Sequence, residues 1–200
     1  MRRRLEMALL FACALAVPAC GGGDAGPTST PPAPPTSSST EASRPTTAPP
    51  VATPVDLDAL RARPCSGITT AQQRELGFQV EPVEVPTADY GTCVWDQSEP
   101  DADGKQFGYI LRVDTAVDPL DDAYRESDER TPTDDLTWGV FEPGTVADLP
   151  AVVRSLDDRT AQCEVIVGAG GGQGLSVKGV VSPPSPDLCD RLVQAAELAL

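Results

Sequence analysis

Four widely spaced cysteines constrain the fold of this chain more than any other sequence feature. They are Cys65, Cys93, Cys163 and Cys189. The chain has no Cys-x-x-Cys pair and no histidine, so the spacing does not indicate a zinc site. An even number of cysteines is typical of a disulfide-bonded domain in an exported protein. Four cysteines can pair in three ways, and we favour Cys65–Cys93 and Cys163–Cys189 because each pair then lies within one half of the domain.

The first 19 residues have the layout of a secretory signal peptide. Three arginines at positions 2–4 precede an apolar run over residues 7–17, and the small residue Ala19 follows. The apolar run is about half as long as the roughly 20 residues that a membrane-spanning helix needs. We therefore predict that residues 1–19 are a cleaved export signal, which places the domain in an oxidising compartment.

The residues around Cys20 predict a lipid anchor. The sequence Val17-Pro18-Ala19-Cys20 resembles the bacterial lipoprotein signal. The resemblance implies that the Cys20 thiol receives a diacylglycerol, that acyl chains such as palmitate are attached, and that cleavage leaves Cys20 as the first residue. Two or three acyl chains anchor a protein stably. We expect the protein on the extracytoplasmic face of the cell membrane; the alternative is a secreted protein with an incidental cysteine.

Residues 20–55 are predicted to be the lipidated N-terminus followed by a disordered tether. Residues 21–55 contain 9 prolines and 12 serines and threonines, without apolar periodicity. Such a composition cannot bury enough apolar surface to offset the entropy lost on ordering. A single domain is therefore expected over residues 56–200.

The charge of the chain limits its partners. The net charge is −15, and residues 55–200 contain 11 Lys and Arg against 27 Asp and Glu, a formal charge of −16. An acidic surface repels phosphate backbones and anionic lipid headgroups, so nucleic-acid binding is not expected, and partners are expected to be neutral, basic or cationic. The absence of histidine excludes Ser-His-Asp and Cys-His catalysis.

Capping signals and apolar alternation predict the elements of the domain. In the first half we first expect a short helix that starts at Thr69 or Thr70, with Gln72 or Gln73 at the capping-box position, and ends at Gly77. An edge strand over residues 80–85, a strand over 90–97, a hairpin connection over 99–104 and a strand over 107–115 follow. In the second half we expect a helix opened by Asp118-Pro119, a loop over 127–135, strands over 138–146, 151–155, 162–167 and 175–181, a glycine turn over 168–174, and a last helix opened by Ser185-Pro186. Pro143-Gly144 is expected to interrupt the strand over 138–146.

The order helix, strands, helix, strands, helix predicts an α+β domain, with an antiparallel sheet, helices packed on it and two disulfides. Alternation places Cys93 and Trp95 on one face of their strand. Cys189 belongs to the apolar stripe of the last helix and faces inward, where Cys163 on a neighbouring strand can meet it.

The layout of the cysteines is similar to that of a known family. Pro64-Cys65-Ser66 before a short helix, the strand motif Cys93-Val94-Trp95, a late strand cysteine at 163 and a helix cysteine at 189 resemble actinobacterial lipoproteins with a four-cysteine domain of unknown function. The resemblance implies the cell envelope and the disulfides. It implies no catalytic residue. More distantly, the plan is similar to extracytoplasmic sensor domains of actinobacterial receptor kinases.

Other candidate sites favour structural roles. The paired carboxylates are Asp121/Asp122, Asp134/Asp135 and Asp157/Asp158. Glu99, Asp101 and Asp103 before Gly104 form only part of a calcium loop. The glycines over 168–174 lack the Lys-Ser/Thr that follows a phosphate-binding loop. Trp95 and Trp138 are expected in the core. We therefore predict no catalytic residue, no metal and no cofactor.

These observations favour a non-enzymatic domain that binds an envelope protein or a small ligand through an exposed sheet face or a groove. A sensor-type accessory to an envelope receptor or transporter is the alternative. A hydrolase that uses only carboxylates is the reading least supported by the sequence.

Overall fold

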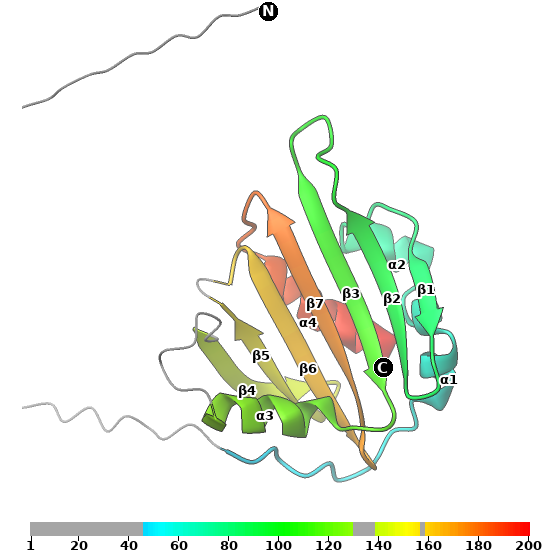
Figure 1. The fold of residues 1–200 in the computed structure, drawn as a ribbon, viewed down its shortest axis with the longest axis vertical. Coiled ribbons are helices and arrows are strands. Elements are labelled where there is room, and N and C mark those ends of the chain that lie inside the picture. Colours follow the sequence, from blue (N-terminus) through cyan, green and yellow to red (C-terminus); the bar gives the residue numbers. More distant parts are fainter. Residues whose placement is uncertain (1–45, 130–138, 157–158) are drawn as a thin grey trace, which may run out of the picture. The chain divides into compact units, whose positions relative to one another are not determined.

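The computed structural model describes residues 46–129, 139–156 and 159–200. These residues form one seven-stranded sheet in which every neighbouring pair of strands is antiparallel, in the order β1-β2-β3-β7-β6-β5-β4 (Figure 1). The strands are β1 (Val83–Pro86), β2 (Tyr90–Gln97), β3 (Gln106–Asp114), β4 (Val140–Val146), β5 (Leu149–Ser155), β6 (Gln162–Gly170) and β7 (Gln173–Ser182). The helices are α1 (Asp58–Ala62), the 3-10 helix η1 (Pro64–Gly67), α2 (Thr70–Glu75), α3 (Pro119–Glu129) and α4 (Leu188–Ala199). The predicted antiparallel sheet with helices is confirmed.

Two runs of hairpins build the sheet. Strands β1 to β3 follow one another along the chain and in space, and so do β4 to β7 in reverse order. The two runs meet where β3 pairs with β7, from Gln106 opposite Ser182 to Asp114 opposite Gly174. Helix α3 connects the runs, because it follows β3 and precedes the edge strand β4.

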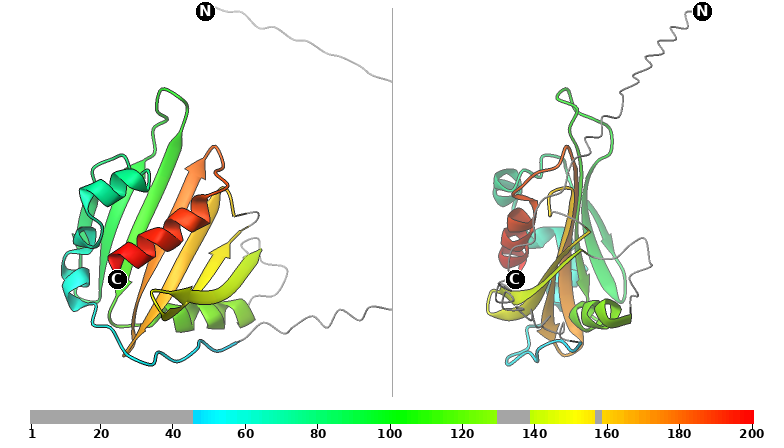
Figure 2. Two further views of the ribbon diagram at one scale, coloured as in Figure 1. Left: turned by 180° about the vertical axis from the view of Figure 1, so that it is seen from behind. Right: turned by 90° about the vertical axis from the view of Figure 1, so that its left-hand side faces the viewer.

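Helices α3 and α4 lie on opposite faces of the sheet (Figure 2). Helix α4 covers the larger core, whose buried side chains include Trp95, Leu111, Val177 and Leu192. Helix α3 covers a smaller core around Leu120, Tyr124, Phe141, Val152 and Ile166. Successive side chains of a strand point to opposite faces, so each strand in the middle of the sheet contributes to both sides.

Both predicted disulfides are confirmed. Cys65 of η1 is bonded to Cys93 of β2, with 28 residues between their positions and 4.9 Å between their Cα atoms. Cys163 of β6 is bonded to Cys189 of α4, 26 residues apart, with 5.5 Å between Cα atoms. One bond therefore ties the N-terminal helices to the sheet, and the other ties α4 to it.

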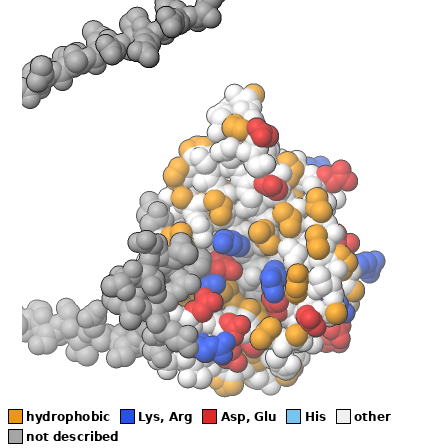
Figure 3. Space-filling model, viewed as in Figure 1, with side chains coloured by type: hydrophobic (Ala, Val, Ile, Leu, Met, Phe, Trp, Pro, Cys, Tyr) orange, Lys and Arg blue, Asp and Glu red, His pale blue; other side chains and the backbone are white. Residues whose placement is uncertain are grey.

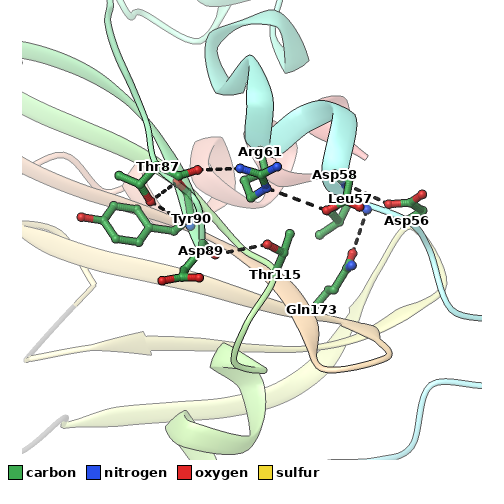
Figure 4. Close-up of polar contacts among 9 residues, drawn as sticks. All are labelled: Asp56, Leu57, Asp58, Arg61, Thr87, Asp89, Tyr90, Thr115 and Gln173. Atoms are coloured by element: carbon green, nitrogen blue, oxygen red, sulfur yellow. Dashed lines mark hydrogen bonds and ion pairs between the residues drawn. The ribbon is translucent and has the colours of Figure 1, made fainter.

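The segment before α1 is held against the domain. Val51 and Val55 pack on the larger core. The amide of Val55 donates to the carbonyl of Ala169 (2.9 Å), and the amide of Leu57 donates to Oε1 of Gln173 (2.9 Å). Figure 4 shows Leu57 joined in this way to the β6–β7 turn. The last residues of the predicted tether thus contact the domain.

Helix α1 is held at its other end by the turn between β1 and β2. Nη1 of Arg61 donates to the carbonyl of Thr87, and Thr87 bonds in turn with Tyr90 (Figure 4). The carbonyl of Arg61 lies against Gly91 of β2, where a Cβ atom would come within 2.1 Å of it. Glycine is therefore required at position 91 by the approach of α1.

Helix boundaries differ from the predictions at three places. Three helical segments, not one, precede the sheet, although α2 has the predicted Thr69 capping box with Gln72. Helix α3 continues through Ser127 to Glu129, where a loop was expected; Ser127 Oγ bonds back to the carbonyl of Tyr124 and so fits a helix. Helix α4 begins at Leu188, after Ser185-Pro186.

Strand bounds differ from the predictions by up to three residues; the edge strand expected over residues 80–85, for example, is β1 at Val83–Pro86. Two predicted local features also differ. Strand β4 is not interrupted at Pro143-Gly144, because β4 is an edge strand, where a proline needs no partner on its open side. The predicted glycine turn over residues 168–174 is shorter, since Gly168 and Gly174 pair with each other within β6 and β7. The turn itself contains Gly171 and Gly172, both with positive φ.

Candidate ligand-binding face

Helix α3 covers only part of its side of the sheet (Figure 1), and the side chains on the rest of that side are partly or fully exposed. We call this exposed part, on strands β1, β2, β3 and β7, the open face. It presents the side chains of Val83, Val85, Thr92, Val94, Ile110, Arg112, Ser176, Lys178 and Val180. Four of its aliphatic side chains are among the exposed large hydrophobic residues: Val83 (63% exposed), Val85 (46%), Ile110 (37%) and Val180 (46%).

The strand register lines up one row of side chains across the sheet. From the β1 edge to β5, the row reads Val83, Val94, Ile110, Lys178, Glu164 and Arg154. Residues directly opposite one another in antiparallel strands share a face and contact each other. The row therefore changes from apolar to charged at Lys178, in the middle of the sheet. Figure 3 shows Lys and Arg side chains at the centre of this face with hydrophobic side chains beside them.

Two neighbouring hollows lie where the open face meets α3. The first, about 400 Å³, is lined by Val85, Tyr90, Thr92, Ile110, Arg112, Glu164, Ser176 and Lys178. The second, about 320 Å³, lies beneath α3 and shares Arg112, Glu164 and Ser176 with the first. Small-molecule sites usually have volumes of roughly 300–1,000 Å³ and combine apolar walls with a few polar groups. Both hollows have this size, but only the first has this composition, because the second is lined mainly by charged side chains such as Asp122, Glu126 and Arg154.

Arg112 is held in place at the boundary of the two hollows. Its Nε and Nη2 donate to the buried carboxylate of Asp114 at 2.7–3.0 Å, and its guanidinium lies 4.2 Å from the ring centroid of Tyr90. The hydrogen bonds to Asp114 raise the pKa of Arg112 above its usual value. A cation fixed by a bidentate pair and a ring has little freedom to move.

Arg154 joins the sheet to α3. Its Nε donates to Oε2 of Glu164 (2.9 Å) and its Nη1 to Oε2 of Glu126 on α3 (2.9 Å). The side chain of Arg154 is 12% exposed and that of Glu164 13%, so this ion pair is shielded from water. The carboxylate of Glu164 is therefore engaged by Arg154 and not by Lys178, its neighbour across the strands.

Lys178 is the cation of the open face without a carboxylate partner. Among the described residues, no Asp or Glu oxygen lies within 4.0 Å of its ammonium group. The chain has only two lysines, and the other, Lys105, pairs with Asp103 at 3.7 Å in the β2–β3 hairpin. Lys178 is partly buried and lines the larger of the two hollows.

Two further hollows lie elsewhere on the domain, and each contains polar groups that bond within the fold. One, about 500 Å³, contains Arg191, which donates to the Tyr109 hydroxyl (3.3 Å) and to Ser185 Oγ (2.9 Å) and pairs with Asp187. Burial raises the pKa of Tyr109, so its hydroxyl stays protonated. The other, about 750 Å³, lies beside α2, where Gln73 donates to the carbonyl of Ile68 (2.7 Å). The hollow beside α2 is also lined by the exposed side chains of Arg74 and Glu81, which make no ion pair with the described residues. It lacks the exposed aliphatic side chains that adjoin Lys178 on the open face.

Several of the candidate carboxylates lie in the described residues and make contacts close by in the chain. Asp122 pairs with Arg125 on α3, and burial, together with Asp121 and Asp122, raises the pKa of Asp118 at the start of that helix. Oδ1 of Asp101 accepts the amides of Asp103 and Lys105 (2.8 Å each), as expected for a hairpin turn.

Of the other candidate site residues, one lies in the core and the rest lie outside the residues that the structure describes. Trp95 is fully buried, as predicted. Cys20, Asp134/Asp135, Trp138 and Asp157/Asp158 lie outside the residues that the structure describes. Within the described ranges, no group of three or more His, Cys, Asp or Glu side chains is arranged to hold a metal ion. No helix in these ranges combines the length and the apolar character needed to cross a membrane.

Comparison with known proteins places the chain in a family. The family model described as a protein of unknown function (DUF3558) matches residues 15–200. The chain belongs to the DUF3558 family. The match includes Cys20 and all four cysteines of this DUF3558 domain, and it confirms the resemblance to a domain of unknown function. No curated protein and no solved structure matches the chain.

Sequence reasoning did not single out the open face of this DUF3558 domain. Alternation along β3 and β7 identifies Ile110, Arg112 and Lys178 as facing away from the larger core. It does not indicate which strands lie side by side, and Lys178 meets Ile110 only through the pairing of β3 with β7. The one sequence feature that could have drawn attention to Lys178 is that the chain contains only two lysines.

Proposed function

We propose that this protein is a lipoprotein attached through Cys20 to the extracytoplasmic face of the cell membrane, and that its domain binds a ligand or partner on the open face without catalysing a reaction. The observation that carries the binding role is the mixed character of this face, with exposed aliphatic side chains next to Lys178. Exposed apolar groups of this kind, rimmed by polar residues, mark interaction sites.

A binding role is favoured over catalysis by the way the carboxylates of this region are engaged. Asp114 accepts from Arg112, and Glu164 and Glu126 accept from Arg154. These three carboxylates therefore accept bonds from guanidinium groups of the protein itself, and these bonds lie within the sheet or join it to α3. The lipoprotein role is supported by the segment from Val17 to Cys20, which resembles the signal of actinobacterial lipoproteins and lies within the family match.

The anchor is tested by replacing each cysteine of the N-terminal segment in turn. In cells given labelled palmitate, we expect the wild-type chain to incorporate label and Cys20→Ser to lose it completely, because the thiol of Cys20 is the proposed attachment point. Cys13→Ser is the matched control and should keep full incorporation, since residue 13 lies in the predicted signal. Label retained in Cys20→Ser would exclude this anchor.

The binding surface is tested by photo-crosslinking in cells. A photoreactive residue at Ile110, on the open face, is compared with one at Gln194, which is exposed on α4 on the other side of the sheet. We expect the probe at residue 110 to give an adduct that recurs between replicates and is absent with the probe at 194. Identical adducts from both positions, or none from position 110, would contradict binding on the open face.

A further inference from the structure

We propose that the occupant of the open face is a single amphiphile with an anionic head, a carboxylate or a phosphate, held at Lys178, and an apolar part lying across Ile110 and Val94. The inference rests on the binding function proposed above and names the chemistry of the ligand. Four observations support it: the apolar half of the row, the unpaired lysine, the size of the hollow and the charge of the rest of the domain.

The apolar half of the row provides the surface for an apolar chain. Val83, Val94 and Ile110 are directly opposite one another on β1, β2 and β3, and Val85 lies beside them. Three strand spacings of about 4.8 Å separate Val83 from Lys178, so the row is roughly 14 Å long. Covering aliphatic side chains removes about 25 cal/mol of unfavourable free energy for each Å² taken from water.

The charged end of the row selects the head group. Arg112 is committed to Asp114, and Arg154 to Glu164 and Glu126, whereas no carboxylate of the described residues lies within 4.0 Å of the Lys178 ammonium. An anion there would receive up to three N–H donors from a partly buried ammonium. The one carboxylate that lines this hollow, Glu164, is paired with Arg154, so a cationic head would meet Lys178 and Arg112 and no uncommitted carboxylate of the described lining. Charge complementarity therefore favours the anion.

The size and charge of the domain indicate one molecule and not a larger surface. The hollow beside Lys178 has a volume of about 400 Å³, which suits a single small ligand. A second copy of the chain or an anionic bilayer would face the formal charge of −16 carried by residues 55–200. Charge repulsion opposes both over the range of a Debye length, about 8–10 Å at moderate ionic strength. A single anionic head meets the same repulsion but brings only one or two charges, and Lys178 is the local cation that offsets it.

The two lysines allow a direct footprint. The full chain carrying Cys20→Ser is treated with an amine-modifying reagent, and the modification of Lys178 and Lys105 is followed by mass spectrometry. The probes are dodecanoate and dodecyl phosphate, each below its critical micelle concentration. We expect each probe to slow the modification of Lys178 about tenfold, which corresponds to a free energy of about 1.4 kcal/mol. Lys105, exposed in the hairpin, is the internal control and should be modified at an unchanged rate.

Variants test the contacts on both ends of the ligand. Lys178→Gln should weaken dodecanoate binding, measured by titration calorimetry, about tenfold, because one charge-assisted contact is lost. Ile110→Ser should weaken it severalfold through lost apolar contact. Lys105→Gln removes the same charge outside the face and should bind as the parent chain does. Equal binding by Lys178→Gln and the parent would overturn the proposal.

Other probes separate the remaining explanations. Dodecyltrimethylammonium has the same chain with a cationic head, and inorganic phosphate has the anion without a chain; neither should protect Lys178 at the concentrations used. Protection by the cationic probe would exclude the anionic head, and equal protection by phosphate alone would exclude the apolar part. If no amphiphile binds while the crosslink at residue 110 recurs, the ligand class is wrong and the binding face stands; if both fail, the binding function itself is wrong.

Discussion

Replacing Cys163 and Cys189 together by alanine is expected to lower the free energy of unfolding by about 3–4 kcal/mol. This disulfide closes a loop of 26 residues between β6 and α4. Cross-linking restricts the unfolded chain, and a loop of this length corresponds to about 3.5 kcal/mol of chain entropy. Since small domains are stable by only about 5–15 kcal/mol, the bond accounts for a large part of the total.

The second disulfide serves as the matched comparison. Cys65 and Cys93 close a loop of 28 residues, so the entropic contribution is nearly the same. Cys163 and Cys189 are both buried, whereas Cys65 is only partly buried. Removing sulfur atoms from a packed core adds a cavity cost, so the Cys163→Ala/Cys189→Ala variant should be the less stable of the two.

Urea unfolding of the full chain carrying Cys20→Ser, with and without each pair of alanines, measures both losses. A decrease below about 1 kcal/mol for Cys163→Ala/Cys189→Ala would show that α4 is held mainly by its apolar stripe. A larger loss for the Cys65–Cys93 pair would contradict the cavity argument.

Local signals in the sequence predicted the elements that depend on neighbouring residues. Strand β2 has the predicted bounds, with Cys93 and Trp95 buried on one face. The capping box of Thr69 was found because it requires only residues within one helical turn. The disulfide pairing was found because each pair lies within one half of the domain.

Features that depend on the tertiary structure were missed. Ala147 and Asp148 form the β4–β5 turn with φ values of 48° and 65°, a conformation that the turn imposes although alanine does not favour it. Helix α3 extends to Glu129 although the composition of its last residues is typical of a loop, because tertiary context prevails over local helix propensity.

The open face belongs to the same class of feature. The alternation of apolar residues indicates that the side chains of Ile110 and Lys178 point away from the larger core. It does not indicate that α3 leaves them uncovered on the other face. That depends on where α3 packs, over Phe141, Val152 and Ile166 at the β4 side of the sheet. The sequence therefore predicted an exposed sheet face, and the structure identifies the residues on it.

Gly91→Ala is the single substitution expected to have the largest effect on the sheet. A Cβ atom at position 91 would lie 2.1 Å from the carbonyl oxygen of Arg61 and 2.9 Å from its carbonyl carbon. Both are backbone atoms of α1, which cannot turn away as a side chain could. The helix would have to move, losing the bond from Arg61 to Thr87 (Figure 4). Forced overpacking of this kind costs about 3 kcal/mol.

Gly108 provides the control, because it lies in the neighbouring strand β3 and its Cβ would meet nothing closer than 3.9 Å, at Asp96 Oδ1. Gly108→Ala is expected to leave stability unchanged or raise it by up to about 1 kcal/mol, since alanine reduces the freedom of the unfolded chain. Urea unfolding compares the two variants, and hydrogen exchange of the amides of α1 localises the change. If Gly91→Ala were as stable as Gly108→Ala, helix α1 would not be fixed against β2 as the structure has it; faster exchange confined to α1 and the adjoining turn would show that this contact holds the N-terminal helix to the sheet.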